Sequence, residues 1–135
     1  MAKKVKDKEP VFIRKIKNKA VRDKVMNTIK FPRLVSLDSS DMKYILGKAK
    51  STSIVSIKAS PEKIVKILGQ KLKKRGEVKG AILLLEGGTS MRLEELSYIT
   101  GSVCKRLGPE TNVIWGAGIN GSMGKEISVD MILAG

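Results

Sequence analysis

After residue 50 the apolar residues follow two spacings in turn, and this alternation restricts the fold more than any other feature of the chain. Strict alternation of apolar and polar residues, or a short continuous apolar run, is typical of a β-strand. Repeats at three and four residues are typical of an amphipathic helix. The pattern predicts strand, helix, strand, helix, strand and strand at 51–59, 60–74, 80–88, 93–108, 112–119 and 126–135.

Both expected helices have start or stop signals in the sequence. Ser60 suits the N-cap position of the first helix, and Pro61 suits its first helical position. Gly108 and Pro109 end the second helix. These signals support the order β-α-β-α-β-β.

This order predicts the fold class. Strand–helix–strand units favour mainly parallel pairing with right-handed crossovers. The last two strands are separated by 120–125, a loop suited to an antiparallel hairpin. With both helices on one face, we expect an α/β (α+β) two-layer sandwich on a mixed four-stranded sheet.

The segment before residue 47 has a weaker pattern. Apolar residues at helical spacing predict an amphipathic helix within 11–29, which Pro32 ends. A loop over 36–40 follows. Asp41 is then expected to cap a short helix that runs to Leu46.

The N-terminal segment is more basic than the rest of the chain. The formal net charge is +14, and the first 30 residues hold 11 Lys or Arg against 3 Asp or Glu, which is +8 of that total. We therefore expect a basic arm and helix at 1–25 and a folded domain at 26–135. A solvated, self-repelling tail explains this charge, and so does contact with nucleic acid, an anionic lipid surface or an acidic protein. The expected contact residues are Lys3, Lys4, Lys6, Arg14, Lys15, Lys17, Lys19 and Arg22.

Composition excludes several kinds of site. The chain has no histidine, which rules out a Ser-His-Asp triad, a Cys-His pair and a histidine metal site. Its single cysteine, Cys104, falls within a helical apolar pattern and is expected to be a core thiol. We expect no cofactor and no metal. No apolar stretch approaches the ~20 residues that span a bilayer, and the N-terminus lacks an apolar signal region, so the expected location is cytoplasmic.

Two glycine-rich stretches fail as nucleotide sites. The stretch from Gly116 to Gly121 matches G-x-G-x-x-G, but a strand follows it where the dinucleotide motif requires a helix. Gly87 and Gly88 precede a helix, and their backbone N–H groups suit an anion. However, no Lys-Ser/Thr follows as in a phosphate loop, and a tight strand-to-helix turn explains both glycines.

Asp38 and Asp41 are the most unusual residues of the segment "RLVSLDSSDMKYIL", residues 33–46. Taken alone, they are interpreted as a turn aspartate and a helix N-cap. Neither a basic partner nor metal ligands lie nearby in the sequence, so the pair does not make a complete catalytic site. If these carboxylates take part in chemistry, the substrate comes from another molecule.

The same segment resembles the loop and helix start that open the C-terminal domain of the FtsZ family, the prokaryotic relatives of tubulin. The family's pattern is close to P-G-L-I-N-L-D-F-A-D-V-K. Residues 80–119 resemble the family's strand, Gly-rich turn, helix and strand, with "NVIWGA" similar to archaeal members, and 126–135 resembles its last strand. The resemblance covers roughly residues 26–135 and implies the same mixed-sheet fold. In the opening segment the matching residues are Pro32, Leu34, Leu37, Asp38, Asp41 and Lys43.

The resemblance also implies a role for the two aspartates. In FtsZ and tubulin polymers this loop enters the GTP pocket of the next subunit, and its acidic residues orient the attacking water. By resemblance, Asp38 and Asp41 inherit that role, while Ser36 replaces the family's loop asparagine. The family's GTPase half is absent from these 135 residues, so the chain is not expected to be an enzyme.

Three functions follow from these features. The first is a non-GTPase FtsZ-like interaction protein that docks on FtsZ-family subunits or filaments through its acidic loop and modulates assembly or GTP hydrolysis in cell division. The second is a nucleic-acid- or anionic-surface-binding module that uses the basic arm on the same fold. The third is a diverged relative that self-associates through an edge strand or an apolar surface, as a homo-oligomer.

Overall fold

The structure is a computed structural model that describes residues 17–23, 39–73 and 78–135. Residues 19–23 form a short helix. The strands and helices predicted after residue 50 are all present, and the strand predicted at 112–119 has those bounds. The labelled elements are α4 (Ser39–Gly47), β1 (Thr52–Ala59), α5 (Pro61–Lys73), β2 (Gly80–Gly87), α6 (Leu93–Leu107), β3 (Asn112–Ile119) and β4 (Ile127–Ala134).

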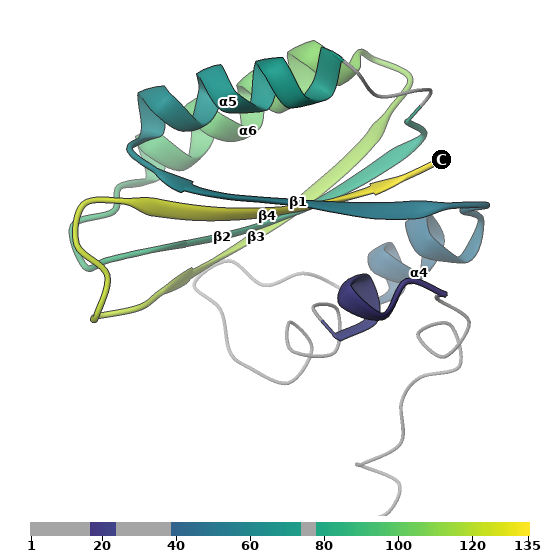
Figure 1. Cartoon of the computed structure of the whole chain (residues 1–135), viewed down its shortest axis with the longest axis horizontal. Coiled ribbons are helices and arrows are strands. Elements are labelled where there is room, and N and C mark those ends of the chain that lie inside the picture. The colour runs from purple at the N-terminus through teal and green to yellow at the C-terminus, as the bar shows by residue number, and fades with distance from the viewer. Residues whose placement is uncertain (1–16, 24–38, 74–77) are drawn as a thin grey trace, which may run out of the picture.

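The four strands form one mixed sheet in the order β1-β4-β2-β3 (Figure 1). β2 pairs with β3 in parallel, and β4 pairs antiparallel with both β1 and β2. The mixed four-stranded sheet confirms the predicted fold class. Two predicted details of the pairing are wrong: β3 and β4 do not form a hairpin, and antiparallel pairing predominates.

β4 occupies a central position, and its second half is apolar on both faces. Met131 and Ile132 are adjacent in sequence and both have no exposed surface, and they pack into core clusters on opposite faces of the sheet. Burying apolar area contributes about 25 cal/mol per Å², which favours placing such a strand between two others. Periodicity shows which face of a strand is buried but not which strand lies beside it, so the hairpin expectation failed.

The connection from β3 to β4 crosses the end of β2. The backbone N–H of Asn120 donates a hydrogen bond to the carbonyl oxygen of Gly87 over 2.8 Å. A Cβ atom on Gly88 would collide with the backbone oxygens of Met123 and Gly124. Gly88 is therefore required by the close approach of a second backbone segment, in addition to the tight turn that the sequence predicts.

α5 and α6 cover one face of the sheet, as predicted (Figure 1). α5 begins at Pro61, and α6 ends where Gly108 adopts φ of 93° and its N–H donates to the carbonyl oxygen of Cys104 over 2.9 Å. Cys104 itself is exposed, so the expectation of a core thiol is wrong. The core-facing stripe of α6 runs through Leu96, Ile99 and Val103, and Cys104 follows one residue later, off that stripe.

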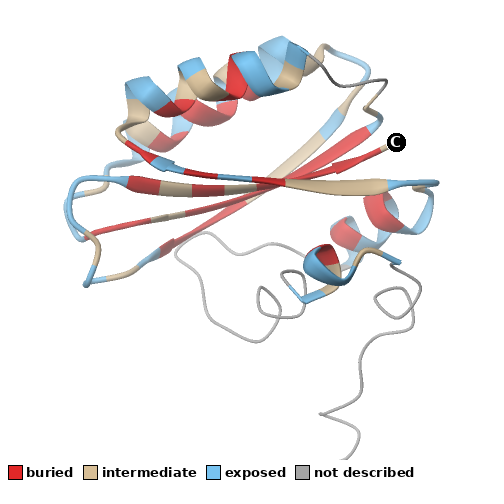
Figure 2. Cartoon of the chain, viewed as in Figure 1, coloured by how far each residue is buried: buried red, intermediate tan, exposed pale blue. Residues whose placement is uncertain are grey.

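α4 and the helix at 19–23 pack on the other face of the sheet, which the sequence did not predict (Figure 2). This second core is smaller than the first. It explains why β2 is a continuous apolar run, since alternate residues of β2 face the two cores. The cluster consists of Val21, Met42, Ile45, Leu46, Ile82, Leu84, Ile132 and Ala134.

Two N-terminal expectations have mixed outcomes. α4 begins at Ser39, so Asp41 lies inside the first turn and the predicted N-cap role is wrong. An acidic residue in a first turn still interacts favourably with the helix dipole, by about 0.3–1 kcal/mol. Of the helix expected within 11–29, residues 19–23 are helical, residues 17 and 18 precede the helix, and the other positions lie outside the described residues. Within the described ranges, no helix combines the length and apolarity needed to cross a membrane.

Candidate functional site

The exposed side of α4 contains the one predicted acidic site residue that the structure describes. Met42, Ile45 and Leu46 are buried against the sheet, whereas Asp41 is exposed. Because the buried residues fix the orientation of the helix, the Asp41 carboxylate is accessible to a second molecule. Asp38 and Ser36, the other two predicted loop residues, lie outside the described residues.

An aromatic residue of α4 lies next to a cation that directly follows the helix. Tyr44 is 55% exposed, and the Nζ atom of Lys48 lies 4.0 Å from the centroid of its ring. The two residues are four positions apart, the spacing at which side chains meet on a helix surface. Such a cation–π contact is worth about 0.5–1 kcal/mol at an exposed site.

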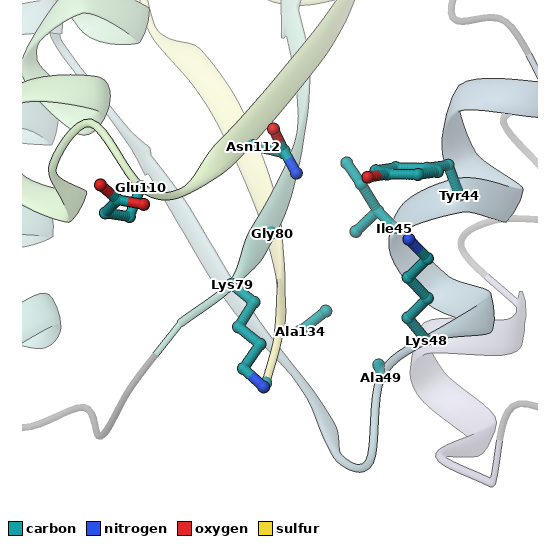
Figure 3. A pocket seen from close by; sticks show the side chains of 10 residues that line it. Tyr44, Ile45, Lys48, Ala49, Lys79, Gly80, Glu110, Asn112 and Ala134 are labelled. Atoms are coloured by element: carbon teal, nitrogen blue, oxygen red, sulfur yellow. The ribbon is translucent and has the colours of Figure 1, made fainter.

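A cavity of about 230 Å³ separates this pair from the edge of the sheet (Figure 3). Tyr44 and Ile45 of α4 form one wall together with Lys48, which directly follows the helix, as Figure 3 shows. Lys79 and Asn112 contribute to the opposite wall, at the starts of β2 and β3. The other lining residues are Ala49, Gly80, Glu110, Ala134 and Gly135.

A second cavity, of about 280 Å³, lies between residues 17–18 and the connection from α4 to β1. Its lining includes Lys17 and Lys50, and none of the described residues that line it is acidic. The side-chain oxygen of Asn18 caps the short helix by accepting hydrogen bonds from the N–H groups of Ala20, over 3.0 Å, and Val21, over 3.3 Å. Ala49 lines both cavities, so the two are adjacent.

The predicted basic contact residues are only partly described. Lys17 is exposed and lines the second cavity, and Arg22 is half-buried. Lys19 is exposed and its Nζ lies 3.0 Å from Oδ2 of Asp23, a surface ion pair of the kind worth at most about 1 kcal/mol. The remaining predicted residues lie outside the described ranges: Lys3, Lys4, Lys6, Arg14 and Lys15.

The sequence predicted the acidic loop and the basic arm as sites, but not the surface formed by Tyr44, Lys48, Lys79 and Asn112. The spacing of Tyr44 and Lys48 was visible in the sequence and would have indicated a paired aromatic and cation. Lys79 and Asn112 join this surface only through strand pairing, which no local pattern reveals. Across the described ranges, no group of three or more His, Cys, Asp or Glu residues could hold a metal ion.

Comparisons with known proteins relate this chain to one family. The model of the FtsZ family's C-terminal domain matches residues 46–135. Cell division protein FtsZ 2 of Methanocaldococcus jannaschii is 30% identical over 122 residues, covering 82% of this chain and 32% of that protein. Cell division protein FtsZ of Methanothermobacter thermautotrophicus is 28% identical over 111 residues, covering 77% of this chain and 29% of that protein. The chain thus spans about a third of the length of these relatives.

Solved structures show the same fold at lower identity. An empty FtsZ dimer from M. jannaschii superimposes with a TM-score of 0.66 at 21% identity, covering 87% of this chain and 38% of that one. TubZ in the GDP-form protofilaments of Bacillus thuringiensis serovar israelensis gives 0.56 at 13% identity, covering 84% and 36%. With the family model matched over residues 46–135, this chain belongs to the FtsZ family and contains its C-terminal domain.

Proposed function

We propose that this chain is a non-GTPase interaction protein that docks on FtsZ-family subunits or filaments and modulates their assembly or GTP hydrolysis during cell division in the cytoplasm. The proposal rests on one observation above others. Asp41 is exposed in the first turn of α4, on a helix whose opposite side is fixed in the core. A docking surface needs such an accessible group on a rigid element.

The comparisons support a role exercised on a partner. The family match is to the C-terminal domain, so the partner would supply the nucleotide and its pocket. Residues 46–135 are 90 of 135 residues, or about 67% of the chain, whereas the alignment with FtsZ 2 covers 82%. That alignment therefore extends to residues before 46, the part of the chain that contains Asp41.

The chemistry required of Asp41 and Asp38 is modest. Phosphoryl transfer depends on positioning and electrostatic stabilisation rather than on covalent chemistry by the protein. A carboxylate that enters a neighbouring nucleotide pocket accepts a hydrogen bond from water and orients it toward the terminal phosphate. Inhibition is the alternative outcome. Position 36 holds serine in place of the family's asparagine, and a carboxylate inserted without that asparagine beside it occupies the pocket and blocks addition of the next subunit.

The direct test mixes the purified chain with a purified archaeal FtsZ and follows polymer mass by sedimentation and GTP turnover by phosphate release. We expect a concentration-dependent change in both. Asp41→Asn should reduce the effect severalfold, because the amide lacks the negative charge. The matched control is Glu62→Gln on α5, which removes an exposed first-turn carboxylate from the opposite face of the sheet and should leave the effect unchanged. No binding and no change at excess wild-type chain would reject the proposal.

A second candidate function is binding of polyanions by the basic N-terminal segment. It is favoured by the second cavity, which is lined by Lys17 of that segment and Lys50 of the folded domain and by no acidic residue among those that the structure describes. Val21 is fully buried and Asn18 Nδ2 donates to the carbonyl oxygen of Thr52 over 3.4 Å, so the segment from 17 is part of the fold. A truncation should therefore remove residues 1–16 only.

This second function predicts a steep dependence on salt, since each neutralised phosphate releases counterions. Removing residues 1–16 should weaken binding to a labelled DNA duplex and flatten its salt dependence. Lys17→Gln should produce a smaller effect in the same direction. An affinity that is unchanged by the truncation would show that the arm is not the contact.

A further inference from the structure

We infer that the cavity between α4 and the starts of β2 and β3 binds single-stranded nucleic acid by stacking one base on Tyr44. This inference goes beyond the proposed docking function and does not depend on it. It also differs from polyanion binding by the arm, because it requires an unstacked base and not only phosphates.

The size of the cavity suits one base. Pockets for drug-sized ligands usually have volumes of about 300–1,000 Å³, and this one measures about 230 Å³. It is bounded by α4 on one side and by the sheet on the other, and it opens to solvent (Figure 3). A single planar ring fits such a slot, with the backbone of the strand remaining outside.

Tyr44 provides the stacking surface. Its side chain is 55% exposed, although its neighbour Ile45 is buried. Lys48 lies over the ring at 4.0 Å from the centroid, so a base stacked on the ring's other face would complete a sandwich of ammonium, phenol and base. Single-strand-binding proteins combine exposed aromatic rings with cationic grooves in this way, and stacking tolerates any base.

Lysines surround the stacking position and extend beyond it. Lys48 and Lys79 line the first cavity, and Lys50 and Lys17 line the second, which shares Ala49 with the first. The two cavities are therefore adjacent, and four lysines line them. Successive phosphates of a strand whose base occupies the first cavity would follow these lysines toward the N-terminal segment.

Polar groups on the sheet side would contact the edge of the base. The amide of Asn112 faces the cavity and offers both donors and an acceptor (Figure 3). Among the described residues of this lining, Glu110 is the one acidic residue, and Figure 3 shows it on the loop before β3, across the strands from α4. Its charge disfavours phosphates there, which places the phosphate backbone of the bound strand on the α4 side, near Lys48.

An acidic peptide is the competing occupant, and the cavity favours nucleic acid over it. Acidic side chains would use the lysines but would leave the exposed ring of Tyr44 and the cavity beside it unused. A DNA duplex would use the lysines too, but its bases are already stacked and paired. The structure therefore predicts a preference for single strands that resides in Tyr44.

The test measures binding of a short fluorescein-labelled single-stranded DNA of mixed sequence by anisotropy, with no FtsZ present. Its comparison probes are the same sequence as a duplex, an abasic strand of equal charge, and a poly-glutamate peptide of equal charge. We expect the single strand to bind at least about fivefold more tightly than the abasic strand, because stacking on an aromatic ring contributes that much per base. This comparison needs no variant, so it does not depend on any mutant folding.

Variants then locate the site. Tyr44→Ala should remove most of the difference between the normal and the abasic strand, and Tyr44→Phe should retain it. The matched control is Tyr98→Ala on α6, a tyrosine that is 50% exposed and lies on the opposite layer. Lys79→Gln should weaken both strands about equally, whereas Glu110→Gln should tighten both.

Three results would overturn the inference. The first is equal binding of the normal and abasic strands. The second is a loss with Tyr98→Ala as large as that with Tyr44→Ala. The third is a poly-glutamate peptide that binds as tightly as the single strand, which would assign the lysines to acidic proteins. If the N-terminal arm were the contact, removing residues 1–16 would weaken binding of every probe alike. FtsZ docking would respond to Asp41→Asn, and that substitution should not change binding of the oligonucleotide.

Discussion

The two faces of the sheet differ in how completely they are closed. The face under α5 and α6 buries a large apolar cluster, and two long helices cover it. The face under α4 buries a smaller cluster, and two open cavities lie beside its helix. The difference comes from the sheet as well as from its covers, because on the α4 face β1 and β4 also carry polar residues such as Ser56, whose hydroxyl donates to Oδ1 of Asp130 over 2.6 Å.

This difference suggests a division of roles. Full burial of side chains such as Ile64 and Ile99 contributes most to the stability of a small domain. The α4 face keeps exposed groups of three kinds at one helix: a carboxylate at Asp41, a ring at Tyr44 and an ammonium at Lys48. Binding requires such accessible groups on a fixed element, and α4 provides both.

The largest expected effects are on stability, when one buried side chain is truncated on each face of the sheet. Ile99→Ala truncates a fully buried side chain of α6 and should reduce the free energy of unfolding by about 3–5 kcal/mol. Ile45→Ala should reduce it by about 2 kcal/mol, because Ile45 borders a cavity that already opens to solvent. Urea unfolding followed by circular dichroism measures both. A larger loss for Ile45→Ala would contradict the assignment of the main core to the α5–α6 face.

Alanine substitutions at two glycines, one packed against each helical layer, test the comparison between the two faces further. A Cβ on Gly80 would lie 2.7 Å from Cγ2 of the buried Ile45, whereas a Cβ on Gly69 would lie 2.5 Å from Cζ of Arg106. The exposed arginine swings aside, and alanine is a better helix former by up to about 1 kcal/mol. Ile45 is β-branched and buried, and the added Cβ would also lie 3.4 Å from its own Cβ, so we expect making room to shift α4. We expect Gly69→Ala to be neutral or stabilising by thermal melting.

Gly80→Ala should have the opposite sign. Overpacking of this kind costs about 1–3 kcal/mol, and a displaced α4 should also weaken binding of the single-stranded oligonucleotide. If Gly80→Ala melts at the wild-type temperature and binds normally, α4 is not held against the start of β2 as the structure describes.

The smallest expected effect concerns the first-turn carboxylates. Asp41→Asn on α4 and Glu62→Gln on α5 each remove a favourable interaction with a helix dipole, worth about 0.3–1 kcal/mol. Their losses of stability, compared in the same urea experiment, should be similar. Only Asp41→Asn should also change GTP turnover by a partner FtsZ. Equal effects of the two variants on turnover would remove the distinction between the faces.

The sequence predicted the local features of the fold well and the long-range ones poorly. Pro61 begins a helix and Gly108 ends one because their backbone preferences act locally. The placement of β4 between β1 and β2 depends on pairing between distant segments, which periodicity does not encode. For the same reason the sequence did not bring Lys79 and Asn112 to the side of Tyr44.

Hydrogen–deuterium exchange of this chain, alone and in the presence of an archaeal FtsZ, tests the central claim most directly. If docking uses the α4 face, the amides of α4 and of the preceding acidic loop should gain protection in the mixture, while those of α5 and α6 should exchange as they do in the free chain. Protection confined to α5 and α6, or no change anywhere at saturating FtsZ, would contradict the account.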